Sequence, residues 1–240
     1  MSETFEYRNI GSDVVAFTTQ RTLGRDRKRL CQMLNIEDEN LIIPHQVHSD
    51  KVFAVDEDFL SLTKEQRKEQ LEGVDAVIPS IPGICIGVST ADCIPILIYD
   101  KKTHSVAAIH AGWRGTVSRI TRNAIRLMEE TYGSHPEDMS AVIGPGISLK
   151  NFEIGDEVYN KFVESGFNMS LIAEKYKKWH IDLWEANRQI LLECGVREEN
   201  IHIERICTYD NTDSLFSARV EQKGTVKCGR NFNAIMLKST

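Results

Sequence analysis

Two histidines stand three residues apart in the segment IIPHQVHSDKV (42–52), and either could serve as a metal ligand. Pro44 disfavours a helix here, and the β-branched residues around it favour a strand. Successive side chains of a strand point to opposite faces, so His45 and His48 should face opposite ways, with Gln46 on the face of His48. We therefore expect at most one of the two histidines to belong to any one site.

A cysteine and a further histidine end two other apolar segments. STADCIPILIYD places Asp92 and Cys93 between strands, and VAAIHAGWRGT ends a strand on His110. Together with His48, these side chains supply one thiolate and two imidazoles, a ligand set that suits zinc and leaves a fourth tetrahedral position for water or substrate. Taken singly, a buried thiol or a hydrogen-bonded core histidine is the commoner role for such residues.

Glycine turns and arginines offer places for an anion. AGWRGT runs from the end of a strand into a helix expected to start at Thr116, where backbone N–H groups and Arg114 would favour negative charge. Near the C-terminus, LFSARV should place Ser217 and Arg219 on one side of an extended segment, and CGRNF carries Arg230. A packed turn with solvated arginines explains the same residues equally well.

The elements that would position these residues predict an α+β protein. Apolar runs typical of β-structure predict strands at 14–18, 41–48, 51–55, 75–80, 83–90, 94–100, 105–111, 139–144, 200–205 and 232–237. Helical spacing predicts helices at 25–35, 116–133, 155–165 and 183–194. The four central strands are joined too closely for crossover helices, so their sheet should be mixed or largely antiparallel. Strands at the centre with helices outside predict a layered sandwich.

The composition is that of a soluble globular protein. Of the 240 residues, 41% are hydrophobic and 27% charged, and no apolar run is long enough to span a bilayer. The acidic N-terminus lacks a signal region, so we expect a cytoplasmic protein. A net charge of -6 with scattered basic residues argues against nucleic-acid binding and favours a small neutral or phosphorylated substrate. We expect one domain over residues 1–240, as a monomer or homodimer.

The cysteines contain no CxxC pair, which excludes a zinc ribbon or a thioredoxin motif. In a reducing compartment most of them should be buried thiols. The six are Cys31, Cys85, Cys93, Cys194, Cys207 and Cys228.

Taken in order, these segments resemble the YfiH-like laccase-domain family over residues 12–238. The resemblance rests on HQVHSDKV, GVSTADCIPIL and AAIHAGWRGT, together with DAVI, VIGPGIS, HIDLWEANRQILLECGV, CTYD, LFSARV and CGRNFNAIML. Members are named polyphenol oxidases and broad-specificity purine nucleoside phosphorylases. The resemblance implies a four-layer αββα sandwich and a zinc site on His48, Cys93 and His110, with His45 facing away.

The resemblance also implies two reactions. One is phosphorolysis of adenosine, inosine, guanosine and methylthioadenosine to the free base and ribose 1-phosphate, and the other is deamination of adenosine to inosine. Zinc can lower the pKa of a bound water toward ~7, which suits deamination, whereas phosphorolysis needs cationic groups to hold phosphate. The implied catalytic residues are His48, Cys93, His110 and, as a supporting partner or proton carrier, Asp92. Substrate binding is assigned to Gln46, Arg114, Ser217, Arg219, Arg230 and Arg21.

The N-terminal loop FTTQRTLGRDR departs from the glycine-rich TTR-type loop usual in the family, because Gln20 precedes Arg21. This departure leaves the substrate range open. Three other functions also remain open: a cysteine hydrolase or amidase with Cys93 as nucleophile and His110 as base, a copper-dependent polyphenol oxidase, and a metal-holding protein without turnover. Seven dispersed histidines argue against multicopper chemistry, which needs paired clusters, so copper is kept as the alternative to zinc.

Overall fold

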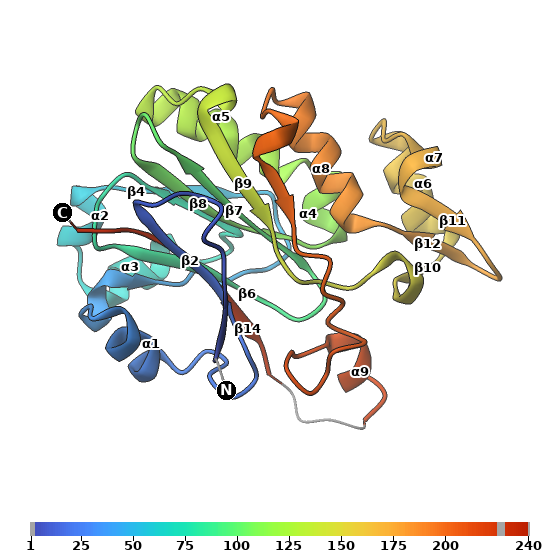
Figure 1. Ribbon diagram of the computed structural model, residues 1–240, viewed down its shortest axis with the longest axis horizontal. Helices are drawn as coiled ribbons and strands as arrows, with labels where there is room; N and C mark the ends of the chain where they lie inside the picture. The colour runs from blue at the N-terminus through green and yellow to red at the C-terminus, as the bar shows by residue number, and fades with distance from the viewer. Residues whose placement is uncertain (1–2, 225–228, 240) are drawn as a thin grey trace.

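The computed structural model describes residues 3–224 and 229–239, and two β-sheets packed face to face form its centre (Figure 1). In spatial order, the five-stranded sheet contains β1 (Thr4–Glu6), β2 (Val14–Thr19), β14 (Asn231–Leu237), β6 (Cys85–Thr90) and β3 (Leu41–Ile42). The six-stranded sheet contains β13 (Ile201–Ile203), β9 (Met139–Ile143), β7 (Ile94–Asp100), β8 (Ser105–Ala111), β5 (Ala76–Pro79) and β4 (Val52–Val55). The pairs β3–β6, β4–β5 and β13–β9 are parallel, and the other pairs in these two sheets are antiparallel.

Alternation along the strands separates two faces of each sheet. In β14, Ile235 faces the other sheet and joins a buried cluster that contains Val88 of the neighbouring strand β6 and Leu97 of β7 in the facing sheet. Its neighbours Ala234 and Met236 point to the opposite side of the same strand. The inner cluster therefore forms the core between the sheets, as the period of two along a strand requires.

Helices cover the two outer faces. Helices α5 (Ile120–Tyr132) and α8 (Leu183–Glu193) pack on the six-stranded sheet, and α1 (Arg27–Leu34) packs on the five-stranded sheet (Figure 1). The order helix, sheet, sheet, helix confirms the predicted four-layer αββα sandwich with mixed, largely antiparallel sheets. No helix among the described residues is both long and apolar enough to cross a membrane.

Short elements complete the structure. A small sheet contains β10 (Glu153–Ile154), β12 (Trp179–Ile181) and β11 (Ala173–Lys175). It lies with α6 (Asp156–Glu164) and α7 (Met169–Ile172) at one end of the sandwich (Figure 1). The remaining α-helices are α2 (Glu57–Ser61), α3 (Lys64–Gln70), α4 (Trp113–Val117) and α9 (Ala218–Glu221). Single 3-10 turns occupy Asp38–Asn40, Pro136–Asp138, Leu149–Asn151 and Glu198–Asn200.

Three local predictions are wrong. The strand expected at 41–48 ends at Ile42, and the chain continues as a loop through His48. The single helix expected over 116–133 is two helices: α4 begins at Trp113, because Gly112 adopts the extended conformation of an N-cap residue, and α5 begins at Ile120, after the left-handed Arg119. LFSARV is not extended throughout, since the Ser217 side chain accepts a hydrogen bond from the first turn of α9.

Candidate metal centre

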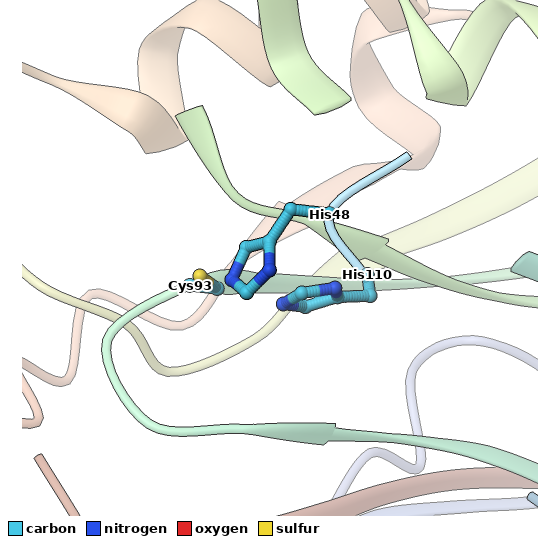
Figure 2. Close-up of side chains that lie close together, drawn as sticks. All are labelled: His48, Cys93 and His110. Carbon is cyan, nitrogen blue, oxygen red and sulfur yellow. The ribbon is translucent and has the colours of Figure 1, made fainter. Parts of the chain in front are cut away.

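Three side chains from separate segments meet at one end of the six-stranded sheet (Figure 2). His110 is the penultimate residue of β8, Cys93 directly precedes β7, and His48 lies in the loop before β4. Their candidate ligand atoms all lie within 4.8 Å of one another, and the two imidazole rings meet edge to face with centroids 4.9 Å apart. Across residues 3–224 and 229–239, this is the one group of three or more His, Cys, Asp and Glu side chains that could hold a metal ion.

Burial is graded across the three ligands. His110 is only 4% exposed, Cys93 is partly buried and His48 is exposed. The buried side of the group fixes the geometry, and the exposed side lets a small molecule reach it.

The backbone around the group is shaped to bring the side chains together. His48 and Asp92 both adopt left-handed conformations, with φ values of 64° and 84°. Non-glycine residues adopt this region rarely and chiefly in tight turns, so the surrounding structure must stabilise both turns in these conformations. Gly112 leaves the space that the side chains occupy, since a Cβ there would lie 2.9 Å from Sγ of Cys93 and 3.1 Å from Cδ2 of His48.

Asp75 is the functional residue that the sequence did not reveal. It directly precedes β5, is completely buried, and its Oδ1 lies 2.7 Å from Nδ1 of His110. Burial alone would raise the pKa of Asp75, but hydrogen bonds from His110, Ser49 and Val47 outweigh burial and lower the pKa to about 2. A single acid at the start of a wholly apolar strand was the signal that could have identified it.

The electrostatics of the group favour a thiolate. Burial raises the pKa of Cys93, but the neighbouring His110 and His48 outweigh burial and lower the pKa below its ordinary value. Burial lowers the pKa of His110, whereas Cys93 and Asp75 raise it overall. The protein therefore stabilises the deprotonated sulfur that metal binding requires.

The residues present fit a zinc ion. One thiolate and two imidazoles are a zinc donor set, and with Zn–S of about 2.3 Å and Zn–N of about 2.0–2.1 Å the ligand atoms would lie about 3.5 Å apart. The observed separations, all within 4.8 Å, are of the same order as that spacing. Because Nδ1 of His110 is engaged by Asp75, Nε2 is the nitrogen left for an ion.

Asp92 connects the turn that carries Cys93 to the C-terminal part of the chain. Its Oδ1 accepts a hydrogen bond of 2.6 Å from Oγ1 of Thr208, and its Oδ2 accepts one of 2.7 Å from the backbone N–H of Arg219. Both carboxylate oxygens thus hold the adjoining loops in place.

Gln46 and Arg114 lie on the segments that carry two of the ligands. The Gln46 side-chain amide donates to the backbone carbonyl of Ser89 at 2.9 Å and accepts from the backbone N–H of Ser89 at 2.7 Å. Gln46 therefore joins the loop that carries His48 to β6. Arg114 is exposed on the first turn of α4, with its guanidinium 4.4 Å from the centre of the Trp113 ring.

The other predicted binding residues form two groups. Ser217 is buried as the N-cap of α9, and the Arg219 guanidinium donates to the carbonyls of Asn151 and Glu153, each at 3.3 Å. Arg21 and Arg230 instead line one cavity of about 430 Å³, whose other lining residues are Leu23, Gly24, Arg25, Phe216 and Gly229.

Two arginines of that cavity, Arg21 and Arg230, have partners within the protein. The Arg21 guanidinium stacks 4.3 Å from the centre of the Phe216 ring, and Arg230 is paired with Glu221 at 3.1 Å. Arg230 directly precedes β14, whose first residue is opposite Thr90, three residues before Cys93.

A larger cavity, of about 620 Å³, lies on the side of the loop that carries His45, between β3 and helices α2 and α3. His45 faces this cavity and pairs with Glu72 at 2.6 Å. None of the three candidate ligands lines it, so the larger cavity is separate from the metal centre. Of the six cysteines, five are free thiols and Cys228 lies outside the described residues.

Comparison with known proteins identifies the family. Residues 2–238 match the family described as multi-copper polyphenol oxidoreductase laccase. The chain belongs to this laccase family. A family relative from Bacteroides thetaiotaomicron, named purine nucleoside phosphorylase, is 45% identical over 216 residues, which cover 89% of this chain and 79% of the relative. A second, named adenosine deaminase RL5 and from an unknown prokaryotic organism, is 39% identical, covering 88% of this chain and 80% of the relative.

A solved structure agrees with the fold of this laccase-family chain. YlmD from Geobacillus stearothermophilus superposes with a TM-score of 0.85 at 24% identity, covering 97% of this chain and 94% of that one. At that identity the likeness concerns the fold alone.

Proposed function

We propose that this laccase-family protein is a zinc-dependent enzyme that acts on purine nucleosides. The observation that carries the proposal is the convergence of His48, Cys93 and His110, because three protein ligands leave a coordination position for a reactant. The names of the two relatives, a purine nucleoside phosphorylase and an adenosine deaminase, support purine nucleosides as the substrate class.

Two reactions follow from these names. In phosphorolysis, a phosphate oxygen bonds to C1′ of the ribose while the C1′–N9 bond breaks and the purine leaves with the electron pair and a proton. Adenosine, inosine, guanosine and methylthioadenosine would each give the free base and the corresponding ribose 1-phosphate. In deamination, water adds at C6 of adenosine and ammonia leaves, which gives inosine.

The residues of the metal centre would hold the ion and prepare the site for both reactions. When bound, zinc supplies Lewis acidity and lowers the pKa of a water molecule at its open position. The Nδ1–H of His110 donates to the Asp75 carboxylate, which leaves Nε2 for the ion, and the lowered pKa of Cys93 keeps the sulfur as thiolate. Asp92 holds the Cys93 turn against α9 through the Arg219 N–H and against the preceding loop through the Thr208 hydroxyl.

Phosphate would be held by arginines. Arg21, Arg25 and Arg230 line one cavity, and their guanidinium groups offer the donor forks that match phosphate oxygens. Arg114, exposed on the first turn of α4, adds a positive charge close in sequence to His110. Gln46, Ser217 and Arg219 would shape the site by bracing the loops around it.

The test is metal analysis of the purified protein, followed by incubation with adenosine in the presence and absence of phosphate. We expect about one zinc ion per chain, adenine only when phosphate is present, and inosine without it. His48→Ala should lose both zinc and activity. His45→Ala is the matched control, since His45 lies in the same loop but pairs with Glu72, and it should retain both. Full activity in the His48→Ala protein would refute the site.

A cysteine hydrolase or amidase is the second candidate, because the lowered pKa of Cys93 beside His110 also describes an activated nucleophile. Alkylation by iodoacetamide separates the two functions. A zinc enzyme is protected while loaded with metal, whereas a thiol enzyme loses activity with or without zinc. Copper in place of zinc in the metal analysis, with oxidation of a phenol, would favour the polyphenol oxidase instead.

A further inference from the structure

We propose that Asp75 is a positioning residue that aligns both histidine ligands from a single carboxylate. It would hold His110 through the imidazole and His48 through the main chain. This inference rests on the metal site of the proposed function and concerns metal binding, not the choice of substrate.

Five hydrogen bonds converge on the two oxygens of Asp75. Oδ1 accepts from Nδ1 of His110 at 2.7 Å and from the backbone N–H of His48 at 3.0 Å. Oδ2 accepts from the backbone N–H groups of Val47 at 3.0 Å and Ser49 at 2.8 Å, and from the Ser49 hydroxyl at 2.8 Å. The side chain is 0% exposed, so water does not compete for these donors.

The arrangement explains the unusual backbone of His48. Three successive N–H groups, from Val47 to Ser49, point at one carboxylate, which is the geometry of an anion-binding nest. A left-handed residue in such a turn lets neighbouring N–H groups converge, and His48 is that residue, with φ of 64°. The buried charge therefore stabilises the turn that aims the His48 side chain at Cys93.

The main chain of Asp75 ties the same two segments together. Its carbonyl accepts the backbone N–H of His110 at 2.8 Å, and its N–H donates to the carbonyl of Lys51 at 3.0 Å. A shift of Asp75 would thus move both histidine-bearing segments at once.

An amide cannot replace this carboxylate. If the nitrogen of Asp75→Asn took the place of Oδ1, it would face the N–H of His48 and would require His110 to accept at Nδ1, which places the proton on Nε2. If it took the place of Oδ2, three donors would lose their acceptor. In either orientation at least one histidine ligand loses its alignment.

The test compares the zinc dissociation constants of wild type, Asp75→Asn and Asp100→Asn, measured by competition with a chromophoric chelator. Asp100 is a matched control, because it is also completely buried, lies at the end of β7 in the same sheet and accepts backbone N–H groups from the following turn, but touches no candidate ligand. Asp75→Asn should bind zinc about 10–100-fold more weakly, and Asp100→Asn within twofold of wild type. Cobalt-loaded Asp75→Asn should also show a changed visible spectrum, which a loss of stability alone would not produce.

Equal zinc affinity and equal cobalt spectra in wild type and Asp75→Asn would overturn the inference. If Asp75→Asn does not fold, NMR of wild type loaded with ¹¹³Cd decides the question. We expect coupling of cadmium to Nε2 of His110 with the proton retained on Nδ1, and coupling to Nδ1 would overturn the inference. None of these measurements uses a nucleoside, so an inactive protein with Asp75-dependent metal affinity would refute the proposed function and leave this inference standing.

Discussion

Replacing Gly112 with alanine would place a methyl group inside the metal centre. Its Cβ would lie 2.9 Å from Sγ of Cys93 and 3.1 Å from Cδ2 of His48. Non-bonded heavy atoms normally stay about 3.5–4.0 Å apart, so both ligands would have to move by several tenths of an ångström. The backbone does not oppose the change, because Gly112 has a φ of -69°, which any residue adopts.

The expected loss of zinc affinity follows from the steric overlap of the added methyl group with the two ligands. In the metal-free protein the exposed His48 can swing away from the new methyl group, but binding an ion would force it back. Overpacking of this kind costs about 1–3 kcal/mol, and about 1.4 kcal/mol corresponds to a tenfold change in an equilibrium constant. We therefore expect Gly112→Ala to bind zinc about 5- to 150-fold more weakly than wild type.

Chelator competition on the folded protein measures this affinity, with a thermal melt as the check on folding. Gly133→Ala is the control, because Gly133 ends α5 with a φ of 68° and has nothing within 4 Å of an added Cβ. That substitution should cost about 1–2 kcal/mol of stability through backbone strain and leave zinc affinity unchanged. Wild-type affinity in a folded Gly112→Ala protein would refute the reasoning.

Leu97→Ala should lower the free energy of unfolding by about 2–5 kcal/mol, because Leu97 is 1% exposed between the two sheets. Denaturant unfolding measures this loss. As a control, Met33→Ala at an exposed position should stay within about 0.5 kcal/mol of wild type. Burial raises the pKa of Asp100, but the backbone N–H of Lys102 and nearby hydroxyl groups lower it overall. The ionised Asp100 therefore contributes its full stabilisation of the folded protein above the ordinary aspartate pKa of about 3.9. That contribution is lost as the pH falls below this value. The stability gap between wild type and Asp100→Asn should shrink in acid, and a gap that stays constant down to about pH 2 would contradict this. Arg230→Gln should raise the KM for phosphate about tenfold through loss of a charged donor without changing zinc affinity, as initial rates and chelator competition would show.

Much of the fold could be predicted from the sequence because long elements have clear periodicity. The continuous apolar runs of β7, β8 and β14 each gave a strand close to its observed bounds, and the helical spacing gave α5 but not the break that separates it from α4. Which sheet a strand joins depends on contacts far along the chain. Thus β6, which lies between β5 and β7 in sequence, pairs with β14 and β3 in the other sheet.

The segment around His48 shows where local patterns fail. Its β-branched residues favour a strand, yet the buried carboxylate of Asp75, 27 residues further on, collects its N–H groups into a turn. The prediction that His45 and His48 face opposite ways assumed a strand that ends at Ile42, before either histidine. The structure nevertheless directs His45 toward Glu72. Nothing within a few residues of His48 indicates that partner, and the single acid before the distant apolar strand β5 does not by itself point to His48.

The central claim is that three side chains distant in sequence share one metal ion. X-ray absorption at the zinc edge of the purified protein tests it most directly, because sulfur and nitrogen ligands differ in bond length by about 0.2–0.3 Å. We predict about one zinc per chain with one sulfur and two imidazole nitrogens, and loss of the sulfur in Cys93→Ser. A shell without sulfur, or one unchanged by Cys93→Ser, would contradict the account.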